Sequence, residues 1–471
     1  MKHSKQNLQL KLQLSNAAEF SHKSAKEITS LANAAKQLIC ANLNLLTQRL
    51  GQPCNLGIAV SGGSDSLAFL FVAKEWAEQR NIELKALTVD HGLRPEAALE
   101  ADYVKDLCKK IGVQHTTLKW TYDKSHKITQ ENARQARHTL FCKWTSDQNI
   151  NALLLGHTLD DRLETMMIRQ NANSSDYGLA AMPSLSASPV WPNGRNLLML
   201  RPANQLSRFD LQAILINQNI RWVCDPSNEN EAYERVRIRN FLTNLTPEDR
   251  TNLETKLSAL SQERADTNIN LNNFLSTHAN WNDDGSVGLS ISNLAKLEHH
   301  LSIRCLERIL LCVSGSQQSV GLSRVEALFN TMASTKDQSA QTHCLGGCWI
   351  IQKDDQLSIY PMPTKRAKTL NAPNAAHQPL HPHETVYFQN RFAVSLNAEI
   401  DGVKLITWDE ASIYGYTPPS PSTDKKARRA MPIAIKQTGA SSSPICLQAE
   451  DYKVTPLHHL RSTHLSHEIF L

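Results

Sequence analysis

The fold is decided by a stretch that joins an apolar run to a glycine- and serine-rich loop: Leu56-Gly57-Ile58-Ala59-Val60-Ser61-Gly62-Gly63-Ser64-Asp65-Ser66. The apolar run predicts a short buried strand, and residues 66–80 have helical periodicity. Glycines let the backbone approach a ligand, and a helix start offers unpaired N–H groups and the positive end of its dipole. The stretch therefore predicts a phosphate site, with an ordinary capped strand–turn–helix as the alternative. It is not a Walker A motif, because no Gly-Lys-Ser/Thr ending follows.

Strands and helices are expected to alternate on both sides of this loop. After the first strand, further strands are expected at 84–89, 115–119, 152–155 and 197–200, and helices at 95–111, 129–147 and 159–172. This alternation is typical of βαβ units and a parallel sheet, which binds ligands at the carboxyl ends of its strands. Beyond residue 241 the pattern favours helices at 247–280, 290–314 and 321–333, then a hairpin at 348–360.

Composition limits the class of protein. Hydrophobic residues make up 41% and charged residues 20% of the 471-residue chain, which is ordinary globular usage. A net charge of +5 permits a nucleic-acid partner without proving one. No apolar run approaches the ~20 residues of a membrane helix, and no signal peptide is recognisable. The 10 cysteines form no C-x-x-C pair, so we expect reduced thiols in a cytoplasmic protein.

Polar motifs follow two of the expected strands. Asp90-His91-Gly92-Leu93-Arg94 comes after the second strand, where it could serve chemistry or cap the next helix. After the fourth strand, Asp160, Asp161 and Glu164 share roughly one helix face. Like charges there repel, and Arg162, a substrate ammonium or a metal could relieve the repulsion.

Two arginine groups have open interpretations. Arg134 and Arg137 lie three apart on a helix and could bridge polyphosphate or pair with Glu131 at the surface. Arg235, Arg237 and Arg239 alternate. In an extended segment they would form a comb for nucleic-acid phosphates, whereas on a helix they would spread around it as solvated charge.

Together these blocks resemble tRNA(Ile)-lysidine synthetase, a bacterial family of the PP-loop ATP pyrophosphatase superfamily. The resemblance covers about residues 55–240 and rests on motifs in the same order: Ser61–Ser66, Val89–Arg94, Glu131–Arg134, Gly156–Thr165, Arg201-Pro202, Asp225–Asn228 and Arg235–Arg239. It implies that ATP and Mg²⁺ activate the wobble cytidine of tRNA(Ile) with a CAU anticodon. Free L-lysine then joins its C2 position, giving lysidine, AMP and pyrophosphate.

The resemblance gives each motif an expected role. The ATP-binding residues are Ser61, Gly62, Gly63, Ser64, Asp65, Ser66 and Arg94, and Asp65 is also a candidate Mg²⁺ ligand. The expected catalytic residues are Asp65, Arg134 and His91. Asp161 and Glu164 are expected to hold the lysine ammonium, and Arg235, Arg237 and Arg239 to contact tRNA.

The expected architecture is an α/β Rossmann-like PP-loop domain followed by a helical domain and a small C-terminal α+β domain. We place an N-terminal extension and helix at 1–50, the catalytic domain at 51–240, the helical tRNA- or substrate-binding domain at 241–362, and a linker with the C-terminal domain at 363–471. A homodimer is compatible with the sequence, and no membrane association is expected.

One segment departs from the family pattern. Residues 170–176 carry asparagine and serine where the family has glycines, although asparagine also tolerates left-handed backbone. A non-catalytic tRNA-binding relative therefore stays open as an alternative to the ligase. Another PP-loop tRNA-modifying enzyme, such as a thiolase, is a second alternative because it shares the superfamily.

Overall fold

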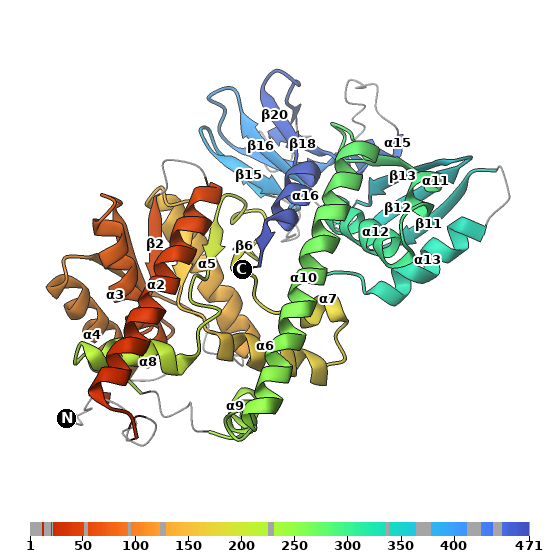
Figure 1. Ribbon diagram of the computed structural model, residues 1–471. Coiled ribbons are helices and arrows are strands. Elements are labelled where there is room, and N and C mark those ends of the chain that lie inside the picture. The colour runs from red at the N-terminus through yellow and green to blue at the C-terminus, as the bar shows by residue number, and fades with distance from the viewer. Residues whose placement is uncertain are drawn as a thin grey trace. The chain divides into compact units, whose positions relative to one another are not determined.

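The chain divides into two units in the computed structural model, which describes residues 12–13, 20, 22–50, 55–92, 96–122, 129–224, 230–334, 339–363, 378–411, 425–436 and 445–470. The first unit is Met1–Asp266 together with His467–Leu471, and the second is Thr267–Ser466 (Figure 1). Each unit has hydrophobic clusters of its own.

A seven-stranded sheet organises the first unit, in the order β21-β6-β7-β5-β2-β3-β4. Neighbours from β7 to β4 run parallel, whereas β6 is antiparallel to β7 and β21 to β6. The chain leaves β2 toward β3 and β4 on one side and returns to β5 and β7 on the other, so the switch point lies between β2 and β5. The strands are β2 (Leu56–Ala59), β3 (Leu84–Asp90), β4 (Gln114–Lys119), β5 (Ala152–Leu155), β6 (Leu185–Ala187), β7 (Leu198–Leu200) and β21 (Glu468–Ile469).

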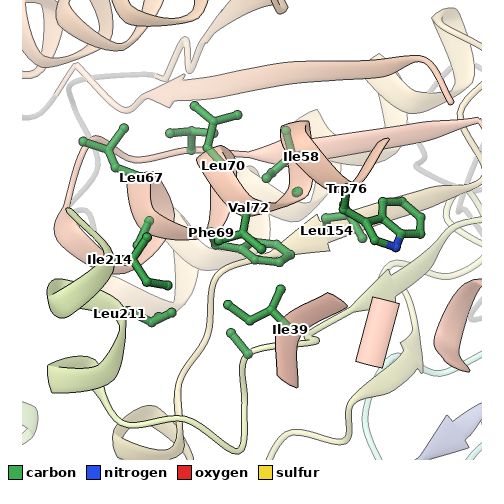
Figure 2. Packing of buried hydrophobic residues seen from close by; sticks show 14 of the residues in the cluster. Ile39, Ile58, Leu67, Phe69, Leu70, Val72, Trp76, Leu154, Leu211 and Ile214 are labelled. Atoms are coloured by element: carbon green, nitrogen blue, oxygen red, sulfur yellow. The ribbon is translucent and has the colours of Figure 1, made fainter. Parts of the chain in front are cut away.

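Helices cover both faces of this sheet. One face packs against α2 (Ala25–Leu50), α3 (Ser64–Glu78), α4 (Glu96–Lys110) and α8 (Arg208–Asn217). Figure 2 shows this core, in which Ile39, Phe69 and Ile214 come from three of these helices and Ile58 and Leu154 from the strands. The other face packs against α5 (Gln130–Asp147) through Phe141 and Trp144. The predicted parallel α/β architecture is confirmed.

A further cluster joins the helices that follow the sheet. Leu163 of α6 (Leu159–Asn171), Ile238 of α9 (Glu234–Thr243) and Leu257 of α10 (Pro247–His278) are buried together, beside the short helix α7 (Asp176–Leu179). This cluster holds α9 against α6, and it thereby positions the arginines of α9 near the carboxylates of α6.

The second unit contains antiparallel sheets. One has the order β11-β12-β13-β10-β9 and packs against α11 (Ile291–Ala295), α12 (His299–Ser314) and α13 (Leu322–Ser334). Its strands are β9 (Asn280–Trp281), β10 (Val287–Ser290), β11 (Gln341–Leu345), β12 (Cys348–Lys353) and β13 (Gln356–Pro361). The predicted hairpin is β12–β13.

Two smaller sheets complete the second unit. Their orders are β14-β17-β18-β19 and β15-β16-β20. The strands are β14 (Gln378–Leu380), β15 (Thr385–Phe388), β16 (Phe392–Leu396), β17 (Val403–Thr407), β18 (Pro432–Lys436), β19 (Ile445–Cys446) and β20 (Tyr452–Pro456), with helices α14 (Trp408–Ala411), α15 (Lys425–Arg428) and α16 (His458–Ser466). The helical region followed by strand-rich C-terminal structure agrees with the predicted fold class.

Elements at both ends of the chain join the first unit. Helix α2, which we expected in an N-terminal extension, lies in the main core, and β1 (Leu12–Gln13) pairs with β8 (Trp222–Val223). Strand β21 extends the central sheet from the C-terminal end. The division at residues 50, 240 and 362 stays a prediction. Every helix in the described ranges is too short or too polar to cross a membrane.

Candidate functional site

The glycine–serine loop closes on itself at the end of β2. The Ser61 amide donates to Ser66 Oγ at 3.1 Å, and Ser66 Oγ donates to the Gly63 carbonyl at 3.1 Å. Gly62 has φ +87°, and a Cβ there would lie 3.2 Å from Val104 and 3.3 Å from Val223. Only glycine fits this conformation and this spacing without strain. The loop therefore brings the start of α3 to the carboxyl end of β2.

The segment after β5 packs directly against this helix start. A Cβ on Gly156 would lie 3.0 Å from Ser66 Cα and 3.2 Å from the Asp65 carbonyl oxygen. The absence of a side chain at Gly156 thus lets the two loops of the switch point meet. Open α/β sheets bind their ligands at this position.

The first acids of α6 are held by backbone and arginine donors. Thr158 and Asp161 form a capping box, in which Asp161 Oδ2 accepts from the Thr158 amide at 3.0 Å. Asp160 Oδ2 accepts from the Arg208 amide at 2.6 Å, and its Oδ1 lies 2.9 Å from Arg250 Nη2. Burial alone would raise the pKa of Asp160, but these two arginines hold it below the usual value. Both acids thus help to fix the start of α6.

Glu164 lies at the centre of the charge network, with its side chain 1% exposed. Its Oε2 is 2.5 Å from Arg235 Nε, and its Oε1 is 2.8 Å from Arg239 Nε. Arg235 Nη2 also reaches Asp161 Oδ1 at 2.7 Å. Arginines of α9 therefore relieve the repulsion on α6. Arg162 does not, because it turns toward the Ala181 carbonyl and Ser261 Oγ.

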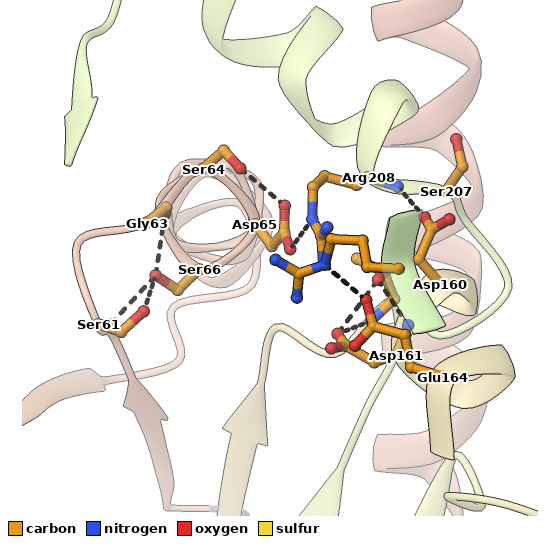
Figure 3. A network of polar contacts seen from close by, with 12 residues as sticks. Ser61, Gly63, Ser64, Asp65, Ser66, Asp160, Asp161, Glu164, Ser207 and Arg208 are labelled. Atoms are coloured by element: carbon orange, nitrogen blue, oxygen red, sulfur yellow. Dashed lines mark hydrogen bonds and ion pairs between the residues drawn. The ribbon is translucent and has the colours of Figure 1, made fainter. Parts of the chain in front are cut away.

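Arg208 connects the phosphate loop with these acids, and sequence reasoning missed it (Figure 3). Its Nε donates to Asp65 Oδ2 at 3.0 Å, and its Nη2 lies 3.8 Å from Glu164 Oε1. Burial alone would lower the pKa of Arg208. The nearby carboxylates have the larger effect and raise this pKa above its ordinary value; they belong to Asp65, Asp161 and Glu164. The Ser207–Asp210 capping box marks the start of α8, but no local signal indicates where the Arg208 side chain points.

Asp65 lies between the loop and Arg208. Its Oδ1 accepts from Ser64 Oγ at 2.8 Å, and its side chain is 18% exposed. Burial raises the pKa of the Asp65 carboxyl, while Arg208 acts in the opposite direction. No group of three or more His, Cys, Asp or Glu side chains in the described ranges is arranged to hold a metal ion.

A cationic region lies on the α5 side. Arg134 is exposed, and neither it nor Arg137 has an ion-pair partner among the described residues. Burial, then Arg137 and Arg134, lowers the pKa of His138 to about 3, and neither ring nitrogen of His138 has a hydrogen-bond partner in the described part of the chain. Burial and neighbouring arginines likewise place the pKa of His157 well below its ordinary value. Within the described ranges, the positive charge of Arg134 and Arg137 is therefore not offset by an ion-paired acid.

The other predicted residues are placed in part. His91 lies against the edge of Trp120, with ring centroids 5.8 Å apart, and its pKa is lowered by burial and by Arg137. Arg94 and Asp225–Asn228 lie outside the described residues. In the altered 170–176 segment, Asn173 takes left-handed backbone with φ 52°, the conformation that asparagine was expected to allow.

The alternating arginines do not form an extended comb, because they lie on helix α9. Arg235 and Arg239 are one turn apart and both contact Glu164. Arg237 points elsewhere, and its Nη1 donates to the carbonyls of Glu231 and Ala232 at 2.7 and 3.2 Å. Among the described residues Arg237 has no carboxylate partner, so the three arginines are not equivalent.

The fold and the loop define a PP-loop protein, and residues 30–246 match the family described as the PP-loop domain. The chain is 35% identical over 312 residues to tRNA(Ile)-lysidine synthase from Hyphomonas neptunium, covering 65% of this chain and 81% of that protein. It is 33% identical over 327 residues to the enzyme of that name from Rhodopseudomonas palustris, covering 66% and 91%. The chain therefore belongs to the tRNA(Ile)-lysidine synthase family.

A solved structure is more distant. The U34-tRNA thiolase NcsA from Methanococcus maripaludis, with its [4Fe-4S] cluster, is 15% identical, with a TM-score of 0.41 over 50% of this chain and 80% of that one. This likeness is too weak to carry an argument about the site.

Proposed function

We propose that this protein uses ATP to join L-lysine to C2 of the wobble cytidine of tRNA(Ile) with a CAU anticodon, giving lysidine, AMP and pyrophosphate. Family membership supports the ligase activity, the use of ATP and the tRNA(Ile) substrate. The observation that carries the proposal is the Arg208 bridge: one side chain spans the phosphate-loop Asp65 and the buried Glu164. This contact supports adjoining ATP and amine subsites, as a reaction between their ligands requires.

ATP binds in the proposal at the loop from Ser61 to Ser66. The amide groups at the start of α3 face the phosphates, and the helix dipole favours their negative charge. Asp65 would hold Mg²⁺ together with the phosphates, a role that fits because each of its oxygens keeps a free lone pair beside Ser64 and Arg208. The ion supplies charge neutralisation on the departing pyrophosphate.

The cationic region supplies further stabilisation of the leaving group. When the cytidine O2 bonds to the α-phosphorus, the bond to pyrophosphate breaks and negative charge grows on the departing oxygens. Arg134 and Arg137 have no acid to neutralise them in the described residues, so their charge is available to that group. His91 is proposed to act on the same leaving group, and Arg94, outside the described residues, keeps its expected role in ATP binding.

Lysine binds in the proposal through the acids of α6. Asp161 and Glu164 hold the substrate ammonium, and Glu164 has lone pairs left after accepting from Arg235 and Arg239. The amine of the lysine side chain, in its neutral form, attacks C2 of the activated cytidine. AMP then leaves, and a nearby carboxylate accepts the proton that the amine releases. Because Arg235 and Arg239 occupy the same acids, lysine has to share or displace their bonds.

The tRNA contacts in the proposal begin on α9. Arg237 can meet a phosphate without breaking an ion pair, whereas Arg235 and Arg239 must leave Glu164 to do so. Residues 241–362 are also proposed to bind tRNA or substrate. The proposed setting is the cytoplasm, where ATP, lysine and tRNA occur together, and a homodimer is compatible with the proposal.

Mass spectrometry of tRNA nucleosides tests the function directly. The protein is incubated with a tRNA(Ile) CAU transcript, ATP and L-lysine, and pyrophosphate release is followed in parallel. We expect lysidine and pyrophosphate in equal amounts, and neither product when uridine replaces the wobble cytidine. Tight tRNA binding without either product would support the non-catalytic alternative, and a sulfur-containing nucleoside would support the thiolase.

A further inference from the structure

A shallow hollow lies between α6 and α9, on the side of α9 away from Arg235 and Arg239. Its volume is about 250 Å³, and its lining residues are Met167, Asn171, Glu234, Arg237, Ile238 and Phe241. Met167 and Ile238 form the apolar floor, which continues into the buried cluster of α6, α9 and α10. The hollow therefore combines an apolar base with polar groups at the rim.

Phe241 is the unusual member of this lining, because it is 51% exposed. Its helix could bury Val236, Ile238 and Leu242 without placing a phenyl ring in water. An exposed aromatic ring beside an arginine is a surface on which a nucleobase stacks, since every base has a π-face. Tyr233, on the residue before α9, is also exposed, at 42%.

The polar rim suits the edge and backbone of a nucleotide. Asn171 Nδ2 donates to Glu234 Oε1 at 3.1 Å, which leaves amide and carboxylate groups able to meet base-edge donors and acceptors. Arg237 is fixed by two backbone carbonyls and has no carboxylate partner in the described residues, so its charge is available to a phosphate. Stacking ring, base-edge groups and cation thus occur within one hollow.

The position of the hollow selects which nucleotide can enter. Met167 and Asn171 follow Glu164 on successive turns of α6, so the hollow begins within about 10 Å of the acids along the helix axis. A wobble cytidine reacting at those acids would bring its neighbour in the anticodon loop over this surface. We propose that the hollow binds the unstacked base of a nucleotide adjacent to the wobble cytidine, with Phe241 as the stacking ring.

This inference rests on the proposed function, and a double-mutant cycle tests it. Affinities of wild type and Phe241→Ala are measured for the tRNA(Ile) CAU transcript and for transcripts that lack the base immediately before or immediately after the wobble cytidine. Loss of the stack should weaken binding of the complete transcript about 5- to 50-fold. For one of the two abasic transcripts the substitution should change the affinity less than about 2-fold, because the base it contacts is already missing.

Control variants separate stacking from folding. Phe241→Trp keeps a stacking surface and should bind within about 3-fold of wild type. Leu45→Ala removes another exposed apolar side chain of the same unit, 42% exposed on α2, and should leave the affinity unchanged. An unchanged affinity of Phe241→Ala for the complete transcript, or an equal loss on all three transcripts, would overturn the proposal. The proposal would also be overturned if Phe241→Ala changed only the self-association of the protein and not its affinity for tRNA.

The product assay keeps this proposal distinct from the proposed function. Phe241→Ala should still form lysidine at saturating tRNA, because a high tRNA concentration offsets the weaker binding that the lost stack causes. If the double-mutant cycle shows the base contact but the wild-type protein forms no lysidine, the result would support the hollow and refute the ligase. Lysidine formation together with a tRNA affinity that does not depend on Phe241 would support the ligase and refute the hollow.

Discussion

Two sets of arginines, one chosen from each unit, make different kinds of contact. In the first unit, Arg208, Arg235 and Arg239 contact carboxylates beside the phosphate loop. In the second, Arg391 donates to the carbonyls of Ser314 at 2.7 Å and Met362 at 2.6 Å, and Arg308 donates to asparagine side chains. In the proposed function, the first arrangement concentrates exchangeable charge where the substrates would carry charge. The second satisfies neutral oxygens, which stabilises the fold and offers nothing to a ligand.

The largest effect is expected at the phosphate loop. Asp65→Ala should lower tRNA-dependent ATP–pyrophosphate exchange by more than about 100-fold, because the loop loses its carboxylate where charge develops. Folding should persist, since burial already disfavours this charge and Arg208 keeps Glu164 nearby. Circular dichroism measures folding, and the rate of ATP–pyrophosphate exchange measures activity. The matched control is Asp147→Ala, at the exposed end of α5. Normal exchange by Asp65→Ala would remove the loop from the chemistry.

The opposite result is expected in the second unit. Arg391→Met removes the donor from the buried Ser314 carbonyl and from the partly buried Met362 carbonyl, which should destabilise that unit by about 2–4 kcal/mol. Exchange activity per folded molecule should stay within about 2-fold of wild type. Urea unfolding measures the first quantity, and Arg324→Met, on the exposed side of α13, is the control. A loss of activity without a loss of stability would contradict the division between the units.

Glu164→Gln removes a negative charge from the first unit while it keeps the shape of the side chain. Glu164→Gln should raise the KM for lysine about 10- to 100-fold and the KM for ATP much less, because a charge-assisted contact to the ammonium is lost. Initial rates at varied lysine and varied ATP measure the two constants. The exposed Glu263→Gln on α10 is the control. Equal increases in both constants would show that Glu164 acts through Arg208, Arg235 and Arg239 on the whole site.

The sequence predicted the loop and the acids because their signals are local. The strand before Ser61, the glycines and the spacing of Asp161 and Glu164 are visible within a few residues. The partners of these residues cannot be found from nearby sequence. Arg208 and Asp65 are 143 positions apart, and Arg235 and Glu164 are 71 apart. Only the packing of the complete unit brings those side chains together.

The structure of short or ambiguous segments could not be predicted from the sequence either. The alternation of arginines with Val236 and Ile238 favoured an extended segment as much as a helix, and burial of Val236, Ile238 and Leu242 decides for the helix. Strand β21 spans two residues, too few for any periodicity, and its pairing with β6 depends on the chain end reaching the sheet.

A pH effect tests the cationic side of the first unit. The folded pKa of His138 is about 3, against 6.5 when unfolded, so between these values the unfolded state binds a proton that the folded state does not. Stability should therefore fall as pH drops below about 6.5, by up to about 2 kcal/mol at pH 5. His138→Phe should lose less stability over this range than wild type, whereas exposed His22→Phe should match it. Hydrogen exchange of the α5 amides measures the difference, and identical pH slopes would show that His138 is protonated in the folded state.

The smallest effect concerns the arginine that has no acid. Each phosphate contact releases condensed counterions, with a slope of ~0.7–0.9 in log affinity against log salt. Arg237→Gln should flatten the salt dependence of tRNA binding by about that amount, because Arg237 can meet a phosphate while bound to carbonyls. Arg235 and Arg239 face Glu164, so the double change to Gln should alter the slope less than Arg237→Gln alone if their ion pairs persist in the complex. Filter binding at several salt concentrations measures all three proteins. A double variant that flattens the slope by nearly two units would mean that both arginines move from Glu164 to tRNA phosphates, and the charge of Glu164 would then be free for lysine only after tRNA has bound.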